Sequence, residues 1–171
     1  MKFKLLWQRI EVMLHPLVML MCLLLICTSP WILIGRQLGS RASFWDVFHV
    51  YGGLFTALLA VMFTYKVCSA GQWRQFFPWL TLEFKPLLAD IRGLLRGQLP
   101  HSGGKGLISV IEGIGVILLL LVVITGGVWY AVEPHAALVW RGYHILFAQG
   151  FIGFIVLHCL LALLHLRDFF S

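Results

Sequence analysis

Four long runs of apolar residues, separated by shorter polar stretches, organise this sequence. They cover residues at about 12–34, 47–67, 107–131 and 143–166. Each run is about 20 residues or longer, which is the length that an α-helix needs to cross the hydrocarbon core of a bilayer. The pattern predicts an all-α integral membrane protein, a bundle of four transmembrane helices that forms one domain over residues 1–171.

The longest stretch outside these runs is residues 68–106, between the second and third predicted helices. After Pro86, leucine and arginine recur at roughly helical spacing. This predicts an interfacial amphipathic helix on the cytoplasmic membrane surface, with docking onto a partner subunit as the alternative. Residues 1–11 form a basic arm that begins the first helix, and residues 131–142 are expected to be an outer loop.

Composition and charge fit this picture. The chain is 60% hydrophobic and only 12% charged, which excludes a soluble domain of this size. Its net charge of +6 does not indicate a nucleic-acid partner, because most of the basic residues fall on one side of the predicted membrane. The positive-inside rule places the richer side, with both termini, in the cytoplasm of a multi-pass protein of the bacterial cytoplasmic (inner) membrane. The richer side holds Lys2, Lys4, Arg9, Lys66, Arg74, Lys85, Arg92, Arg96, Lys105 and Arg167, and the other side holds Arg36, Arg41 and Arg141.

The cysteines carry no recognisable cofactor motif. Cys22, Cys27, Cys68 and Cys159 lie in or at the ends of the apolar runs, without a CxxC or CxxCH pattern. We interpret them as small apolar packing residues.

Four histidines sort by depth in the predicted membrane. His15 begins an outward-running helix and His158 lies late in an inward-running one, so both lie near the cytoplasmic surface. His49 and His144 each open an inward-running helix, so both lie near the outer surface. His144 and His158 are fourteen residues apart, so their side chains leave the same helix face, separated by roughly 21 Å.

Histidines inside a membrane are costly and usually functional. Two cross-helix imidazole pairs, one near each surface, are what bis-histidine ligation of two b-type haems requires. For any single histidine, an interhelical hydrogen bond is an equally good explanation. A zinc or copper site needs three or four ligands at one depth, and a proton relay needs ionisable groups between the two levels; the sequence offers neither.

Other polar residues near the predicted inner haem have open roles. His165 is an alternative inner ligand, but it falls at the end of its helix, which favours a place beside a haem propionate or a quinone. His101 and His135 are expected in loops, His101 on the side of the inner haem. Glu112 is expected to reach the headgroups or pair with Lys105 rather than to relay protons.

Several motifs resemble the cytochrome b561-like superfamily, and most closely the gamma (cytochrome b556) subunit of respiratory formate dehydrogenase. They are H-P-L-V-M-L at His15, H-V-Y-G-G-L-F at His49, L-L-A-D-I-R-G-L-L-R-G and V-I-T-G-G-V-W-Y around the third helix, and H-x13-H in the fourth. The resemblance covers nearly the whole chain.

The resemblance implies that His49 and His144 bind an outer haem b, that His15 and His158 bind an inner one, and that quinone lies near His158. The quinone-site candidates are His158, His165, His101, Lys105 and Glu112. The resemblance also implies an iron–sulfur or other electron-transfer subunit on the outer face, which connects the chain to a large catalytic subunit.

Three functions remain open at this point. The first is the electron-transfer subunit of a quinone-linked respiratory oxidoreductase, with formate dehydrogenase as the example. The second is a free-standing cytochrome b561 oxidoreductase that reduces quinone from a small donor such as superoxide. The third is a membrane anchor without haem. The long connection between the second and third helices favours the first over the second.

Overall fold

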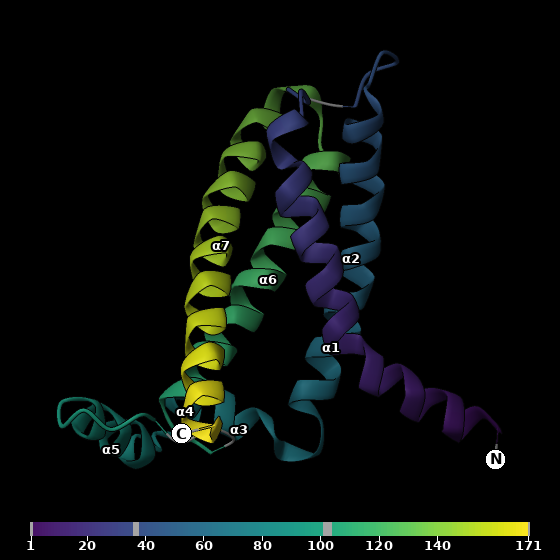
Figure 1. Ribbon diagram of the computed structural model, residues 1–171. Helices are drawn as coiled ribbons and strands as arrows, with labels where there is room; N and C mark the ends of the chain where they lie inside the picture. Colours follow the sequence, from purple (N-terminus) through teal and green to yellow (C-terminus); the bar gives the residue numbers. More distant parts are fainter. Residues whose placement is uncertain (1, 36–37, 101–103, 171) are drawn as a thin grey trace. The chain divides into compact units, whose positions relative to one another are not determined.

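The computed structural model describes residues 2–35, 38–100 and 104–170, and the side chains of residues 12–35, 38–69, 71–100 and 104–165. All regular structure in these residues is helical (Figure 1). The long helices are α1 (Lys2–Thr28), α2 (Phe44–Cys68), α6 (Leu107–Ala131) and α7 (Pro134–Phe170). Each contains a stretch long and apolar enough to span a membrane. The predicted all-α class with four such helices is confirmed.

The first helix ends earlier than predicted. α1 stops at Thr28 rather than near residue 34, and a single 3-10 turn, η1 (Ser29–Trp31), follows it. Pro30 explains the difference, because proline has no N–H to donate and disfavours helical geometry in the residue before it. Pro16 is accommodated inside α1.

The fourth helix begins earlier than predicted. α7 starts at Pro134, so the expected outer loop at 131–142 is wrong: only Val132 and Glu133 separate α6 from α7. Proline favours the first turn of a helix because that turn leaves its N–H unbonded in any case. His135, expected in a loop, lies exposed in the first turn of α7.

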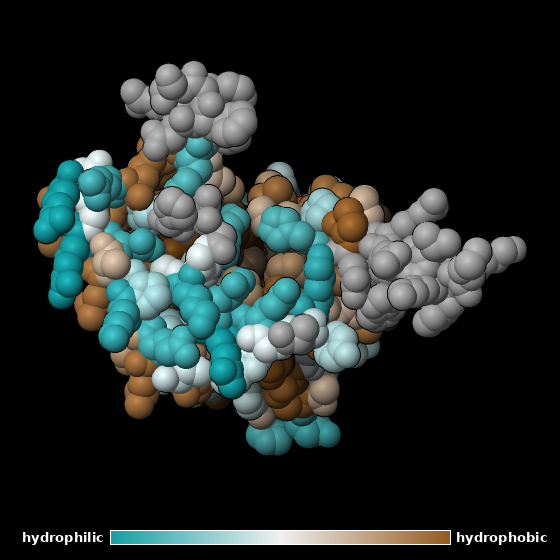
Figure 2. All heavy atoms as spheres, turned by 90° about the horizontal axis from the view of Figure 1, so that it is seen from below, coloured by the Kyte–Doolittle hydropathy of each residue, from teal (hydrophilic) through white to brown (hydrophobic). Residues whose placement is uncertain are grey.

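The connection between α2 and α6 is made of short helical pieces: η2 (Ser69–Gly71), α3 (Trp73–Phe76), α4 (Pro78–Thr81) and α5 (Lys85–Leu94). α5 confirms the helix predicted after Pro86. Its Leu87, Ile91 and Leu94 share one face, and Lys85 and Arg92 lie on the opposite face, as expected of an amphipathic interfacial helix. Figure 2 shows hydrophilic and apolar residues side by side on the face that is seen from below.

The chain divides into two compact units, and the first contains residues Met1–Lys66 and Leu119–Gln149. On α1, Leu14, Val18 and Cys22 recur every four residues and are buried. A Cβ on Gly52 of α2 would lie 3.3 Å from Leu25, so this glycine lets α1 and α2 pack closely.

The second unit contains residues Val67–Leu118 and Gly150–Ser171. Asp90 of α5 accepts a hydrogen bond from the backbone N–H of Leu107 at 2.7 Å, which caps the first turn of α6. A side chain on Gly113 would collide with the carbonyl of Phe76, so glycine is needed where α3 meets α6. The sequence prediction of one domain over residues 1–171 stays a prediction.

Candidate functional site

The structure brings His49 and His144 together inside the first unit. His49 lies in the second turn of α2 and His144 in the third turn of α7. Their ring centres are 6.3 Å apart and the ring planes make an angle of 86°. Two imidazoles from different helices therefore lie next to each other at the same depth of the first unit.

The separation of these two rings can be compared with that of two ligands on one iron. A metal–imidazole bond is about 2.0 Å long, and the ring centre lies about 1.2 Å beyond the nitrogen, so two opposed ligands have ring centres about 6.4 Å apart. The observed 6.3 Å matches this separation. Perpendicular rings are compatible with it, because each ring rotates about its own metal–nitrogen bond. Two protein ligands are the number that a haem iron accepts, because the porphyrin supplies four nitrogens.

Three residues of α6 hold the ring of His144. The Nδ1–H of His144 donates a hydrogen bond to the carbonyl of Val122 at 3.0 Å. Trp129 packs against the ring at 5.9 Å between centres, and a Cβ on Gly126 would lie 3.0 Å from His144 Cε1. Residues 122, 126 and 129 share one face of α6. A hydrogen bond through Nδ1 leaves Nε2 as the ligating nitrogen, which is the usual arrangement of a metal-binding histidine.

His49 supplies the second observation that fits a haem. Its Nδ1 is buried and has no hydrogen-bond partner among the described residues. An unpaired buried nitrogen costs free energy, and coordination of an iron by Nδ1 itself would remove that cost. The two imidazoles are therefore the residues that would hold one haem b.

Asp46 fixes the start of the helix that carries His49. Its side chain is only 4% exposed. It accepts hydrogen bonds from the backbone N–H of Leu33 at 2.8 Å, and from the N–H and hydroxyl of Ser43 at 3.0 and 2.8 Å. The Ser43 hydroxyl in turn accepts a bond from the Asp46 N–H at 3.1 Å. This reciprocal cap sets the first turn of α2 and ties it to the segment that follows α1.

We expect Asp46→Ala to lower the free energy of unfolding by about 3 kcal/mol, because three donors lose their buried acceptor. Thermal unfolding of the purified protein measures the loss. Asp46→Asn keeps one acceptor oxygen and should lose less. An unchanged melting temperature in Asp46→Ala would show that this cap does not stabilise the fold.

The two predicted inner ligands fall in different units. His15 belongs to the first unit, where its ring lies 5.8 Å from that of Phe63 of α2. His158 belongs to the second, where its ring stacks on that of Phe154 at 5.4 Å between centres. Their pairing stays a prediction.

Glu112 of α6 interacts electrostatically with His158 of α7. It does not pair with Lys105, which was one of the two expectations for it; the other, that it reaches the headgroups, stays a prediction. Lys105 instead donates a hydrogen bond to Glu83 at 2.9 Å, because both lie in the connection outside the spans. One acidic side chain thus interacts electrostatically with the predicted inner ligand.

The Lys105 hydrogen bond holds the pKa of the Glu83 carboxyl below its ordinary value. The stability from this pair is present above the carboxyl's ordinary pKa and is lost as the pH falls through the lowered one. Because both side chains are well exposed, the contribution is small.

Both ring nitrogens of His165 lie 2.8 Å from backbone carbonyl oxygens, those of Leu161 and Pro100. With both nitrogens engaged, the ring ties α7 to the connection before α6. This favours His158 over His165 as the inner ligand. His101 lies outside the described residues.

Sequence reasoning missed the residues that orient the outer histidines: Asp46, Val122, Gly126 and Trp129. The third predicted helix was assigned no haem ligand, because it carries no histidine. The spacing of Gly126 and Trp129, which puts both on one helix face, could have indicated a contact with a neighbouring ring. The carbonyl of Val122 leaves no signal in the sequence. The S-x-x-D pattern at Ser43–Asp46 was the signal for the cap.

Comparison with known proteins supports a haem protein. A family model described as prokaryotic cytochrome b561 matches residues 6–168. Neither the curated proteins nor the solved structures gave a match. A match over nearly the whole chain, together with the paired imidazoles and four candidate spans, makes this a multi-pass bacterial membrane protein that binds haem b and transfers electrons. The chain belongs to the prokaryotic cytochrome b561 family.

Proposed function

We propose that this chain is the di-haem cytochrome b subunit that transfers electrons between an oxidoreductase partner outside the cytoplasm and the quinone pool of the inner membrane. The observation that carries the proposal is the pair of buried imidazoles, His49 and His144, at the separation that one iron requires. The inner pair, His15 and His158, completes the proposal and rests on their predicted depth.

The roles of the chain's own residues follow from their contacts. A haem b supplies a one-electron carrier when bound. His144 would hold the outer iron through Nε2, because its Nδ1–H donates to the carbonyl of Val122. Trp129 and Gly126 set the orientation of its ring. Asp46 positions α2 and thereby His49.

Quinone is proposed to react near His158, on the cytoplasmic side. Glu112 of α6 interacts electrostatically with His158 and is proposed to bind the polar quinone headgroup. Lys105 and His165 remain candidates at the edge of this site. In the structure Lys105 is hydrogen-bonded to Glu83, and the ring nitrogens of His165 contact two backbone carbonyls. His101 remains a candidate from the sequence.

The partner is proposed to be an iron–sulfur or similar subunit that docks on the outer face and belongs to a formate dehydrogenase-like complex. Two features support a subunit over a free-standing oxidoreductase. The long connection joins α2 to α6, and the link between α6 and α7 is only two residues long. Because the link between α6 and α7 is short, little of the chain would cover the outer haem, and a partner could reach the surface beside it.

The test is purification of the protein from its native membrane under mild detergent. We expect it to co-elute with an iron–sulfur protein, and its dithionite-reduced haem to be reoxidised when quinone is added without oxygen. A chain that elutes alone yet reduces quinone from superoxide would support the free-standing alternative. Failure of quinone to reoxidise the haem would contradict the proposal.

A further inference from the structure

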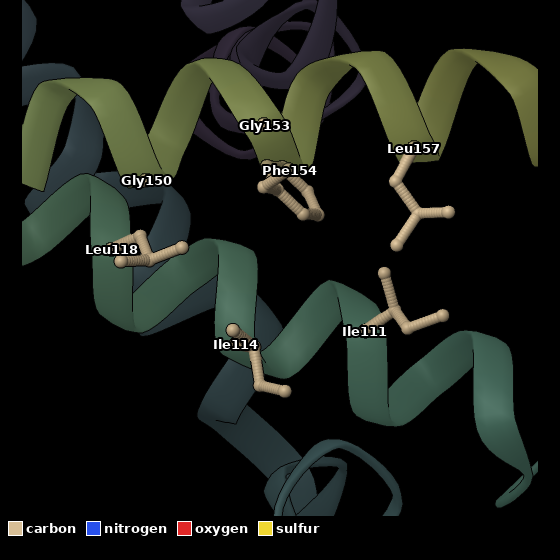
Figure 3. A pocket seen from close by; sticks show the side chains of 7 residues that line it. All are labelled: Ile111, Ile114, Leu118, Gly150, Gly153, Phe154 and Leu157. Atoms are coloured by element: carbon tan, nitrogen blue, oxygen red, sulfur yellow. The ribbon is translucent and has the colours of Figure 1, made fainter.

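An apolar groove lies between α6 and α7 in the second unit. Its volume is about 220 Å³, and its lining comes from Ile111, Ile114, Leu118, Gly150, Gly153, Phe154 and Leu157. In Figure 3, Phe154 and Leu157 point from α7 toward α6, and Ile111 points back toward Leu157. No residue of the lining is charged, and both helices are candidate membrane spans. Only a molecule dissolved in the bilayer has access to such a surface.

Glycine at two positions on α7 keeps the groove open. A Cβ on Gly153 would meet nothing within 4 Å, and one on Gly150 would lie 3.4 Å from Leu118. The space beside Gly153 is therefore free for an apolar chain. A larger residue at Gly153 would fill the groove without a steric clash at its Cβ.

Phe154 links the groove to polar chemistry. Its ring lines the groove, fills the place that a side chain on Gly115 would occupy, and stacks on His158. His158 in turn interacts with Glu112. The lining of the groove is thus apolar, and the imidazole of His158 lies against the ring of Phe154. This arrangement suits an amphiphile with a flat polar head and an apolar tail.

We propose that this groove binds the isoprenoid tail of the quinone, with Phe154 separating the tail from the headgroup position at Glu112 and His158. The inference rests on the proposed function, because it assumes that quinone is the substrate. It adds the tail site and its lining residues. Ile114, Leu118 and Gly153 then discriminate between quinones by their tails.

The test uses Gly153→Leu, with Gly127→Leu as the matched control, because a Cβ at Gly127 of α6 also meets nothing within 4 Å. The probe is a decyl benzoquinone with a photoreactive diazirine at the end of its tail. Crosslinks in the purified full chain are mapped by mass spectrometry, and haem content confirms folding. We expect labelling of residues 111–118 and 150–157, reduced about tenfold in Gly153→Leu, since displacing about two methylene groups costs about that factor.

The outcomes separate the two proposals. Equal labelling in wild type and Gly153→Leu, while tailed quinone still reoxidises the haem in both, would overturn the groove assignment alone. Labelling of the same residues by a diazirine phospholipid that excess quinone does not displace would also overturn it, in favour of a lipid acyl chain. If no quinone reoxidises wild-type haem, the proposed function itself fails.

Discussion

Substituting His49→Ala is expected to remove one haem b from each chain and leave the other bound. The ring of His49 lies at the distance from His144 that two ligands of one iron require, and its Nδ1 has no hydrogen-bond partner in the described part of the chain. Haem content should fall from two to one per chain, with about half of the reduced α-band absorbance lost. His144→Ala should remove the same haem, so the double variant should lose no more than either single one.

The control for this prediction is His135→Ala, because His135 is exposed in the first turn of α7. It should keep both haems. A His49→Ala variant that keeps both haems would contradict the assignment of the outer ligands, and so would different haems lost in His49→Ala and His144→Ala.

Replacing Gly126→Val is expected to disturb the same haem without touching a ligand. A Cβ at this position would lie 3.0 Å from Cε1 and 3.1 Å from Nδ1 of His144, and valine adds two further carbons. The ring must move, which breaks its hydrogen bond to Val122. Overpacking of this kind costs about 1–3 kcal/mol. We expect reduced occupancy of the outer haem, measured by haem content and by potentiometric titration of the α-band.

Gly127→Val is the matched control, since it makes the same change one residue further along α6, where a Cβ meets nothing within 4 Å. Equal haem loss in both variants would point to a general effect of valine on α6. Haem loss in Gly126→Val alone supports the placement of His144 against this face.

The helical architecture was largely predictable because hydrophobic runs determine membrane spans directly. The third span, 107–131, coincides with α6. The second run lacked only the first turn of α2, which depends on the Ser43–Asp46 cap rather than on hydrophobicity. The early start of α7 was missed because polar residues near Arg141 read as a loop, although Pro134 opens a helix. Contacts between residues far apart in the sequence determine where such helices begin, and hydrophobic periodicity carries no information about these contacts.

The proximity of His49 and His144 also followed from the sequence, since depth alone placed both near the outer surface. The geometry around them did not. The Val122 carbonyl that fixes the ring of His144 is a backbone group, present in every residue type, so its role is visible only when α6 and α7 are packed. The salt bridge of Lys105 with Glu83 joins residues twenty-two apart across an irregular connection, which no spacing rule covers.

The most direct test of the account is the haem content of the purified full-length protein, measured as its pyridine haemochrome spectrum against chain concentration. The account predicts two non-covalently bound haems b per chain. A protein that folds and remains stable while binding no haem would contradict it.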